Sequence, residues 1–416
     1  MLDIGQIHRK EYELEKDQSA PVIFAESPGR IHFLGDQGEP EAGIFLSAAV
    51  DRYINLTVSQ RKDNSFRFYA ADIDERKRST VAGLKYRRED RWANYLKPAI
   101  SLFLELGCQM KGLNFSFCGD IPQNIGLASS IAIETAAAAA LRGLLRIQIN
   151  DMDFARKLKE SHEKLFGNSV SLADYLVCFM ARKDHFLLYD SSKNDVKLIK
   201  SPFANFRFLL VDSRVPRMGA EKEIASRYDD VLKGLELLSQ KHEGSGYKDY
   251  ASIDLLEVIG NFPEQVRRRS LHIVEEIRRV NDAADALERA DLASFARIIY
   301  HSHESLRDLY EISCPEVDWL VKRAQEIEGA AGSRMTGIGF GGCTYTIIRR
   351  ELVDEYKRRL EDYERIFGFH NVIYEIKLAS KARLIPEPTD KSKRNVTTTT
   401  SSSPVRKREY ANTTNK

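Results

Sequence analysis

The stretch GDIPQNIGLASSIAIETAAAAALRGLL, residues 119–145, passes from a polar loop directly into an alanine-rich helix, with Ser129 and Ser130 at the junction. The first four N–H groups of a helix have no partners within it, and the helix dipole adds partial positive charge there. The segment therefore predicts either an anion site at a helix N-terminus or a serine-capped core helix that binds nothing.

The residues around this junction favour a phosphate as the anion. Gly126 allows the backbone to approach a ligand closely because it has no side chain. The hydroxyls of Ser129 and Ser130 can donate to phosphate or ligate Mg²⁺, which prefers oxygen ligands. No Gly-Lys-Ser/Thr follows, so this is not a Walker A loop.

A second glycine cluster, GIGFGG at residues 337–342, matches the spacing Gly-x-Gly-x-x-Gly. A dinucleotide-binding loop needs a helix after these glycines, whereas the following CTYTII predicts a strand. A protein-kinase glycine loop also lies between strands, but the sequence has no His-Arg-Asp and no Asp-Phe-Gly motif. The cluster therefore predicts a tight turn, either beside a ligand or purely structural.

The bulk composition is that of an ordinary globular protein of two or three domains. Hydrophobic residues make up 43% of the 416 and charged residues 30%, and the formal net charge is +2. This balance gives no strong field, so we expect neither nucleic acid nor a membrane as a partner. The charged first residues predict no signal peptide, and the longest apolar run is too short to span a membrane.

The five cysteines, Cys108, Cys118, Cys178, Cys314 and Cys343, are scattered and form no Cys-x-x-Cys pair. Their number and spacing predict no disulfide framework and no zinc site, and they favour a reducing, cytoplasmic location. We expect them to behave as small buried hydrophobic residues.

The pattern of predicted elements changes near residue 205. Before it, PVIFAESPGRIHFLG (21–35) predicts a strand broken by a Ser-Pro-Gly turn, and RWANYLKPAISLFLELG (91–107) predicts one amphipathic helix. After it, helical patterns dominate, including one at 252–261. This change of character predicts two α+β domains.

We place these domains at residues 1–205 and 206–385. The tail, residues 386–416, is polar and low in complexity. It cannot bury enough apolar surface to offset the entropy of ordering, which predicts disorder.

Three segments in order resemble the motifs of the GHMP small-molecule kinase superfamily, and most closely its galactokinase branch. They are SPGRIHFLGDQGEPEAGIFLSAAV (27–50), GDIPQNIGLASSIAIE (119–134) and GSRMTGIGFGGCTYTII (332–348). RWANYLK and DLYEISCPEVDWLV also read like galactokinase. The resemblance implies a two-domain α+β fold, with a ribosomal protein S5 domain 2-like N-terminal domain and a ferredoxin-like C-terminal domain, and with ATP and Mg²⁺ between them.

The resemblance also implies which residues carry the chemistry. Asp174, in SLADY, matches the base that accepts the proton of the attacking hydroxyl, and Arg30 matches an arginine beside that base. The implied nucleotide-binding residues are Asn124, Gly126, Leu127, Ala128, Ser129 and Ser130, with Trp92 against the adenine ring. The third motif contributes Gly337, Gly339, Gly341 and Gly342.

The implied magnesium site departs from the family pattern. Ser130 matches one ligand, and the second family ligand is a glutamate. Counting back from Asp174 aligns that glutamate with His162, while Glu163 lies one residue away. Either the register shifts, which makes Glu163 the candidate ligand, or the carboxylate ligand is lost.

The implied sugar-binding residues depart most. The family run Gly-Glu-His-Thr-Asp is matched by GDQGE, which leaves Asp36, Gln37 and Glu39 as candidate substrate-binding residues. A family glycine becomes Ser171, also a candidate, and a family tyrosine that contacts the sugar aligns with Ile224. An unpaired hydroxyl costs about 1–3 kcal/mol, so a site built around hydroxyls discriminates steeply when its partners change.

We therefore expect an ATP-dependent kinase that phosphorylates the anomeric hydroxyl of a monosaccharide, or a derivative, other than galactose. A galactokinase proper with an altered pocket is one alternative. A catalytically silent sensor of sugar or ATP is another. The retained Arg30 and Asp174 argue against the sensor, and the changed metal carboxylate argues for it.

Overall fold

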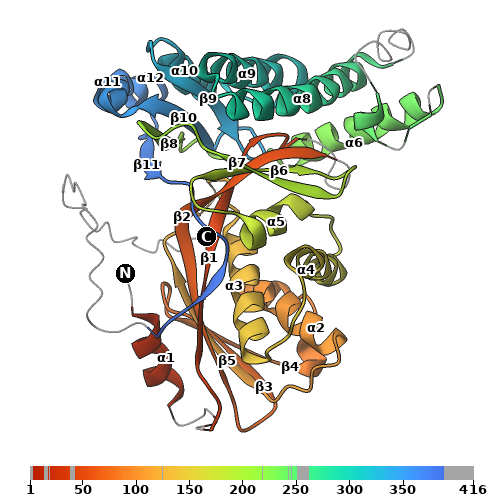
Figure 1. Ribbon diagram of the computed structural model, residues 1–416, viewed down its shortest axis with the longest axis vertical. Helices are drawn as coiled ribbons and strands as arrows, with labels where there is room; N and C mark the ends of the chain where they lie inside the picture. Colours follow the sequence, from red (N-terminus) through yellow and green to blue (C-terminus); the bar gives the residue numbers. More distant parts are fainter. Residues whose placement is uncertain are drawn as a thin grey trace, which may run out of the picture.

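The computed structural model describes residues 3–13, 17, 19–37, 43–123, 125–217, 219–241, 243–244, 246–250 and 262–387. Glu39 and Asn124 lie outside these ranges, as do the helix expected at 252–261 and the predicted tail beyond residue 387. The described chain combines helices with two separate β-sheets (Figure 1), which confirms the α+β prediction.

The larger sheet has eight strands in the described chain, in the order β12-β1-β2-β5-β3-β4, with β6 beside β2 and β7 beside β6. Its pairs are antiparallel except for β3 with β5, which is parallel. The strands are Ile23–Leu34 (β1), Ile44–Gln60 (β2), Ser65–Ala70 (β3), Glu75–Thr80 (β4), Leu113–Gly119 (β5), His185–Asp190 (β6), Asp195–Lys200 (β7) and Arg383–Ile385 (β12).

β1 is continuous, so the predicted break at its Ser-Pro-Gly sequence is wrong. Those residues instead cause a shift in the β1–β2 register between Pro28 and Gly29. Proline cannot donate to a ladder, and an irregularity here lets the strand continue without that hydrogen bond. Beyond the shift, the backbone N–H of Arg30 donates to the carbonyl oxygen of Leu127 at 3.1 Å. The strand is thereby joined to the loop that precedes the alanine-rich helix.

Helices α2 to α5 gather on one side of this sheet, and α1 lies on the other (Figure 1). The alanine-rich helix α3 packs directly on β1 and β2. The helical elements of this part are Ile4–Tyr12 (α1), Val81–Gly83 (η1), Arg88–Leu96 (η2), Lys97–Glu105 (α2), Ser129–Leu144 (α3), Asp151–Phe166 (α4) and Leu172–Met180 (α5).

The single helix predicted at 91–107 is only partly correct. Residues up to Leu96 form 3₁₀ turns, with Arg91 at a φ of 47°, and the α-helix begins at Lys97 with Pro98 in its first turn. Proline is tolerated there because the N–H that it lacks would have no partner within the helix.

The smaller sheet has the order β11-β8-β10-β9 and is antiparallel throughout. Its strands are Phe206–Asp212 (β8), Ala330–Thr336 (β9), Cys343–Arg349 (β10) and Val372–Ile376 (β11). The helical elements of this part are Glu221–Ser239 (α6), Tyr247–Asp249 (η3), Glu264–Glu288 (α8), Leu292–Ser305 (α9), Leu306–Tyr310 (η5), Pro315–Gln325 (α10), Arg350–Leu352 (η6), Val353–Arg359 (α11) and Tyr363–Phe367 (α12). Strand β10 directly follows the second glycine cluster, as predicted.

The chain changes from the larger sheet to the smaller one between Lys200 and Phe206. It returns near its end, where Leu378 bridges Val50 of β2 and β12 pairs with β1. The proposed domains 1–205 and 206–385 therefore follow the two sheets except at this last strand.

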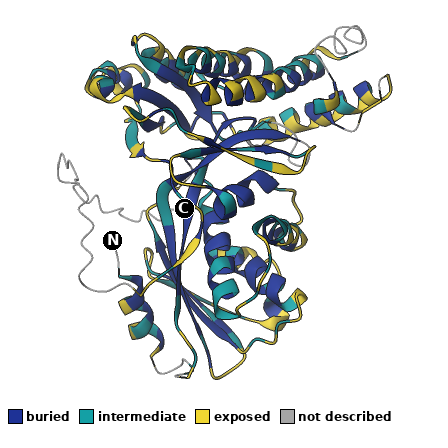
Figure 2. Cartoon of the chain, viewed as in Figure 1, coloured by how far each residue is buried: buried dark blue, intermediate teal, exposed yellow. Residues whose placement is uncertain are grey.

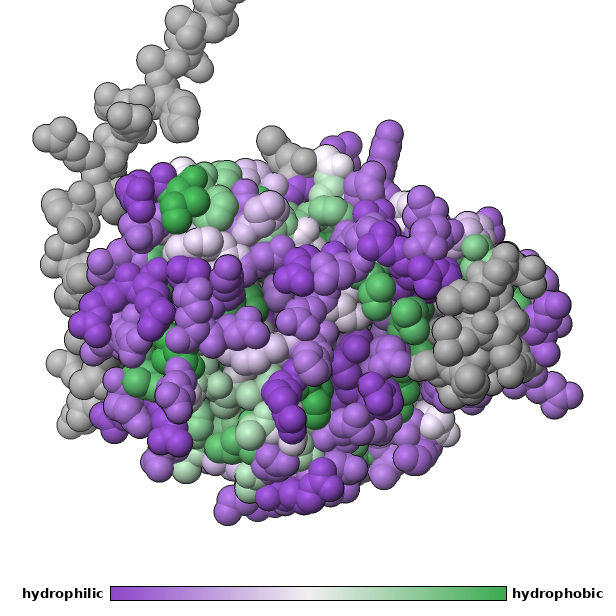
Figure 3. All heavy atoms as spheres, turned by 90° about the horizontal axis from the view of Figure 1, so that it is seen from above, coloured by the Kyte–Doolittle hydropathy of each residue, from purple (hydrophilic) through white to green (hydrophobic). Residues whose placement is uncertain are grey.

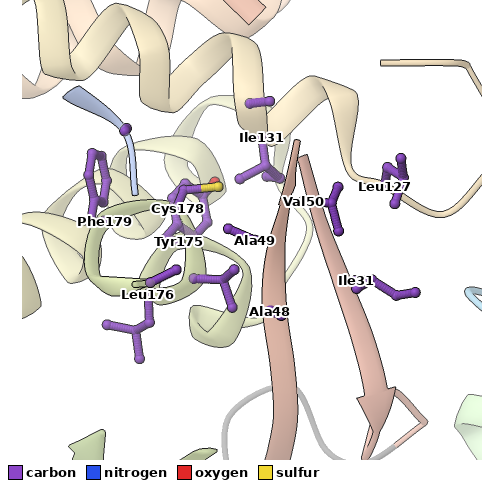
Figure 4. Close-up of a cluster of buried hydrophobic side chains, with 14 of the residues drawn as sticks. Ile31, Ala48, Ala49, Val50, Leu127, Ile131, Tyr175, Leu176, Cys178 and Phe179 are labelled. Carbon is purple, nitrogen blue, oxygen red and sulfur yellow. The ribbon is translucent and has the colours of Figure 1, made fainter. Parts of the chain in front are cut away.

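Burial is strongest in the strands and on the inner faces of the helices (Figure 2). Figure 4 shows one apolar cluster to which Ile31 of β1, Val50 of β2, Ile131 of α3 and Cys178 of α5 contribute. Because packed side chains of this kind tolerate little displacement, the cluster fixes α3 and α5 relative to β1.

The face of the molecule seen from above is mostly polar (Figure 3). Seen from above, hydrophilic side chains dominate, and hydrophobic ones form small groups (Figure 3). Among the described residues, none of the helices has both the length and the apolar character that a membrane span requires.

We predict that Gly332→Ala destabilises the fold more than Gly167→Ala does. Gly332 has a φ of +124°, and a Cβ there would lie 2.9 Å from Cβ of Ile299. Gly167 has a φ of +73° with open space around it. Gly167→Ala should lower the free energy of unfolding by about 1 kcal/mol, through backbone strain alone. Gly332→Ala should lower it by about 3 kcal/mol, because overpacking adds to the strain.

Urea unfolding followed by circular dichroism measures both changes. Equal losses in the two variants would show that the contact between β9 and α9 at this glycine is not tight.

Candidate active site

The alanine-rich helix begins at Ser129, and its N-cap residue is Ala128, in the left-handed conformation with a φ of 53°. Alanine has no side-chain oxygen, so it cannot cap the first N–H groups. The serine cap of that alternative is therefore wrong, and the anion site stays a prediction. Ser129 and Ser130 lie within the first turn and are half-buried. Among the described residues, none accepts from the N–H groups of Ser129 and Ser130, and the positive dipole end of the helix suits an anion.

Gly126 brings the loop before this helix against the second glycine cluster. Its φ is +83°, which favours glycine, and a Cβ there would lie 3.6 Å from Cγ2 of Thr336 and 3.8 Å from Cα of Gly337. The other clustered glycines, Gly339, Gly341 and Gly342, also have positive φ. The sequence predicts a turn that is either beside a ligand or purely structural. The position of the cluster against the Gly126 loop favours a turn beside the ligand.

The side chain of Arg30 joins this loop to the predicted base. Its Nη1 donates to the carbonyl oxygen of Gly126 at 2.8 Å, and its Nε donates to Oδ1 of Asp174 at 2.5 Å. The guanidinium is a rigid, planar fork that stays charged, so it can hold two acceptors in a fixed relation. The two residues predicted to be catalytic are thus in direct contact, beside the loop that leads into Ser129 and Ser130.

Asp174 lies in the first turn of α5, where the helix dipole favours a negative charge. Ser171 is the N-cap of this helix, and its hydroxyl accepts from the N–H of Ala173 at 3.2 Å. Burial alone raises the pKa of Asp174, but the charge of Arg30 and the hydrogen bond from His32 outweigh it and hold the pKa well below its usual value. The carboxylate is therefore ionised at neutral pH and ready to accept a proton.

The predicted sugar-binding residues Asp36 and Gln37 both contact the third motif. Oδ1 of Asp36 accepts from Nη2 of Arg334 at 2.6 Å, and its Oδ2 accepts from the N–H of Gly337 at 3.2 Å. Nε2 of Gln37 donates to the carbonyl oxygen of Gly337 at 2.7 Å. These contacts tie the segment after β1 to the turn between β9 and β10.

Arg334 is fully buried between two carboxylates. Besides Asp36, it donates to Oε1 of Glu276 at 3.2 Å. Glu276 also accepts from Nε of Arg279 at 2.7 Å and from the hydroxyl of Ser302 at 2.8 Å. Burial by itself raises the pKa of Glu276, but the charges of Arg279 and Arg334 outweigh this effect and lower the pKa to about 2. Glu276 is therefore ionised at neutral pH and paired within this cluster.

Comparison with solved structures places this arrangement in a known fold. A crystal structure of Lactococcus lactis galactokinase complexed with galactose aligns with a TM-score of 0.83 at 21% identity, covering 91% of this chain and 98% of that one. A mevalonate kinase structure aligns with a TM-score of 0.60 at 17% identity, covering 87% of this chain and 100% of that one. At these identities the similarity shows the fold alone.

Sequence comparison decides the family. Models described as GHMP kinases N terminal domain and GHMP kinases C terminal match residues 94–182 and 283–365. The galactokinase of Roseiflexus sp. (strain RS-1) is 29% identical over 379 residues, 90% of this chain and 95% of the relative. A Treponema pallidum (strain Nichols) protein with a provisional galactokinase name is 36% identical over 390 residues, 92% of this chain and 97% of the relative. The chain belongs to the GHMP kinase family.

This GHMP kinase falls in the galactokinase-like branch and is a phosphotransferase with an alcohol group as acceptor. GHMP kinases use ATP. Arg30, from the first quoted motif, contacts Gly126 of the second, and Gly126 in turn lies against Thr336 and Gly337 of the third.

Trp92, the residue predicted to contact adenine, is partly buried. Its Nε1 donates to Oε2 of Glu75 at 2.8 Å, and its ring packs edge-to-face on Phe117 with centroids 5.3 Å apart. Contact with adenine stays a prediction for this residue.

The candidate metal carboxylate Glu163 is already engaged. It accepts from Nζ of Lys159 at 2.8 Å and from the hydroxyl of Ser169 and the N–H of Val170, both at 3.1 Å. Within the described ranges, no group of three His, Cys, Asp or Glu side chains is arranged to hold a metal ion. The hydroxyl of Ser130 stays a predicted Mg²⁺ ligand, an oxygen donor of the kind that this ion prefers.

His162, aligned with the family glutamate, makes a different contact. Its Nδ1 lies 2.8 Å from Oε2 of Glu134 on α3, and Tyr175 donates to the other oxygen of Glu134 at 3.1 Å. All three side chains are buried, and burial raises the pKa of Glu134. His162 is thus part of a closed polar cluster in the core behind the base.

Sequence reasoning missed His32, Arg334 and Glu276. His32 lies two residues after Arg30, and strand periodicity alone places the two side chains on one face of β1. The SRMT sequence before the glycine cluster contained Arg334, but nothing local indicates its partners. Glu276 lies in the middle of a long helix among other charged residues, where no pattern distinguishes it.

We predict that Arg30→Lys lowers kcat about 100-fold. Lysine carries a single point charge and cannot hold Gly126 and Asp174 together, so the loop and the base lose their fixed relation. ADP release in the presence of an acceptor measures the change. Arg52→Lys is the matched control, because Arg52 donates to the backbone carbonyls of Asp51 and Glu375. Near-normal kcat in Arg30→Lys would contradict the bridging role.

We predict that Glu276→Gln destabilises the protein at pH 7 and that this difference shrinks as the pH falls from about 4.3 to about 2. The pKa of Glu276 is lowered in the folded state, to about 2. The stability that its charge contributes is therefore present above the unfolded pKa of about 4.3 and is lost on passing below the folded value. Unfolding at pH 7 and pH 3 measures the difference.

Glu355→Gln is the control for this titration, because Glu355 forms an exposed i,i+4 pair with Arg359. That variant should differ little from the parent at either pH. A loss in Glu276→Gln that is the same at both pH values would show that its charge is not what stabilises the fold.

Proposed function

We propose that this protein is an ATP-dependent sugar kinase that transfers the γ-phosphate to the anomeric hydroxyl of a monosaccharide or a derivative. The observation that carries the proposal is the double contact of Arg30 with Gly126 and Asp174. A helix N-terminus suited to phosphate and an ionised carboxylate suited to an alcohol are held together by one cation. Phosphoryl transfer depends mainly on such positioning and charge neutralisation.

Each part has a definite role in the proposed reaction. The N–H groups at Ser129 and Ser130 and the loop at Gly126 hold the phosphates of ATP. Arg30 offsets the charge that builds up as the γ-phosphate leaves ADP. Asp174 accepts the proton of the acceptor hydroxyl, and the oxygen of that hydroxyl forms the new bond to the γ-phosphorus as the bond to ADP breaks. The products are ADP and a sugar phosphate.

Magnesium enters this proposal as part of the substrate, MgATP. The hydroxyl of Ser130 is the protein ligand that we assign to it, and the remaining ligands are phosphate oxygens and water. Glu163 is not required, because its carboxylate is paired with Lys159 and the segment at Ser169. We therefore expect the binding of MgATP to depend only weakly on any protein carboxylate.

We further propose that galactose is not the preferred acceptor. Asp36 and Gln37 are both engaged with Arg334 and Gly337, which reduces what they offer to substrate hydroxyls. Asp36 keeps lone pairs for one further hydrogen bond, so a hydroxyl at this position can still be recognised. Ser171 and Glu39 complete the proposed substrate-binding set.

Galactokinase proper is the second candidate, and the names of the relatives favour it. Roseiflexus galactokinase is similar over nearly the whole chain, and the Lactococcus structure is described as complexed with galactose. A cytoplasmic location fits either candidate, because ATP is available there and the cysteines are free thiols.

A panel of monosaccharides and their derivatives, assayed by ADP release, separates the candidates. Turnover on a sugar other than galactose, with galactose at least 10-fold poorer in kcat/KM, supports the proposal. Efficient turnover of galactose supports galactokinase proper. Binding of ATP and sugar without any turnover would instead favour the silent sensor.

We predict that Asp174→Asn lowers kcat about 1000-fold and changes the Kd for ATP less than about threefold. Asparagine keeps the shape of the side chain but cannot accept a proton, and general base catalysis is worth about 10²–10⁴-fold. Asp151→Asn is the matched control, since Asp151 accepts from Nη1 of Arg142 at 2.7 Å without any role in the proposed site. An active Asp174→Asn would remove the base from the mechanism.

A further inference from the structure

His32 contacts the same carboxylate oxygen as Arg30. Its Nε2 lies 2.7 Å from Oδ1 of Asp174, the oxygen that also accepts from Nε of Arg30. Both residues belong to β1, two positions apart, so their side chains leave the strand on one face. Two groups from one strand therefore converge on one oxygen of the base.

The other edge of the His32 ring is held by Ser47. Nδ1 lies 2.6 Å from Oγ of Ser47, and the two residues are directly paired across the β1–β2 ladder. Both are buried, and the ring of Phe45 packs beside the imidazole with centroids 5.4 Å apart. The orientation of the imidazole is therefore determined by the sheet itself.

The surrounding charges decide which nitrogen of His32 carries the hydrogen. Burial, and then the charge of Arg30, lower the pKa of His32, and this outweighs the opposite effects of Asp174 and Asp36. The ring is therefore neutral at neutral pH. An ionised carboxylate can only accept, so the hydrogen lies on Nε2 and is donated to Asp174. Nδ1 keeps its lone pair and accepts from the hydroxyl of Ser47.

The two oxygens of Asp174 are consequently unequal. Oδ1 accepts from both Arg30 and His32, whereas Oδ2 has no hydrogen-bond partner among the described residues. The side chain of Asp174 is 12% exposed to solvent. Oδ2 is thus the oxygen that remains for a substrate.

We propose that His32 is a positioning residue, which together with Arg30 holds Oδ1 of Asp174 so that Oδ2 faces the acceptor hydroxyl, with Ser47 holding the other edge of the imidazole ring. The inference rests on the proposed function, in which Asp174 is the base. It extends that function by assigning separate tasks to the two carboxylate oxygens.

Two substitutions at position 32 test the donor. His32→Leu removes it, and His32→Gln keeps an N–H at similar reach. We expect kcat to fall about 10–100-fold in His32→Leu, as for a lost hydrogen bond to a charged group, with the KM for ATP nearly unchanged. In His32→Gln, most of kcat should return.

The pH profile separates positioning from a merely structural role. Removing a donor to the ionised carboxylate raises the pKa of Asp174, so the acid limb of kcat/KM should move to higher pH in His32→Leu and less in His32→Gln. Equal impairment of both variants with an unmoved acid limb would overturn the inference.

A double variant shows whether His32 acts through the base. His32→Leu should add no further loss to Asp174→Asn, because residues that act as one unit are not additive. A further tenfold loss would overturn the inference. Asp174→Asn alone tests the proposed function. If it is inactive while His32→Leu is unimpaired, only the role of His32 fails; if it is fully active, the base itself fails.

The tautomer can be read without any turnover. In ¹⁵N NMR spectra of the histidine rings, the signals of His32 are identified by their absence in His32→Gln. We expect the proton on Nε2 in the parent protein and also in Ser47→Ala, because the ionised Asp174 still accepts from that nitrogen. A proton on Nδ1 in the parent protein would overturn the inference.

Discussion

The guanidinium of Arg30 donates at once to the carbonyl oxygen of Gly126 and to the carboxylate of Asp174, while its backbone N–H donates to Leu127. A planar, permanently charged fork is the group best suited to hold two acceptors at a fixed separation. The loop before α3, the start of α5 and the strand β1 therefore form one unit. The apolar cluster of Figure 4 supports this unit from behind, since it packs the same three elements together.

A second set of charges joins the larger sheet to the smaller one. Arg334 of β9 is fully buried, and its partners are Asp36, which follows β1, and Glu276 of α8. Breaking one member of such a set leaves an uncompensated buried charge, which is far more costly than losing an exposed pair. The residues that follow β1 therefore cannot be substituted or displaced without affecting the second glycine cluster, residues 337–342. A substitution of Asp36 that changes substrate preference must therefore still provide a partner for the buried Arg334.

The departures from the family pattern around the base are coupled to one another. His162, which aligns with the family glutamate when the register is not shifted, pairs with Glu134, whose other oxygen accepts from Tyr175. A buried polar cluster is tolerated only when its members are paired, and here each member has a partner. His162 is therefore held in a closed structural cluster, and the ligands of the metal stay a proposal.

Local features of this protein could be read from the sequence, because they depend on a few neighbouring residues. They include the start of α3 at Ser129 and strand β10 after the glycine cluster. Motif resemblance also identified Arg30 and Asp174, which the structure brings into contact. The partners of Asp36 and the role of His32 were decided only by the tertiary structure. Asp36 and Arg334 lie 298 positions apart, and no local pattern encodes which buried groups two sheets will bring together.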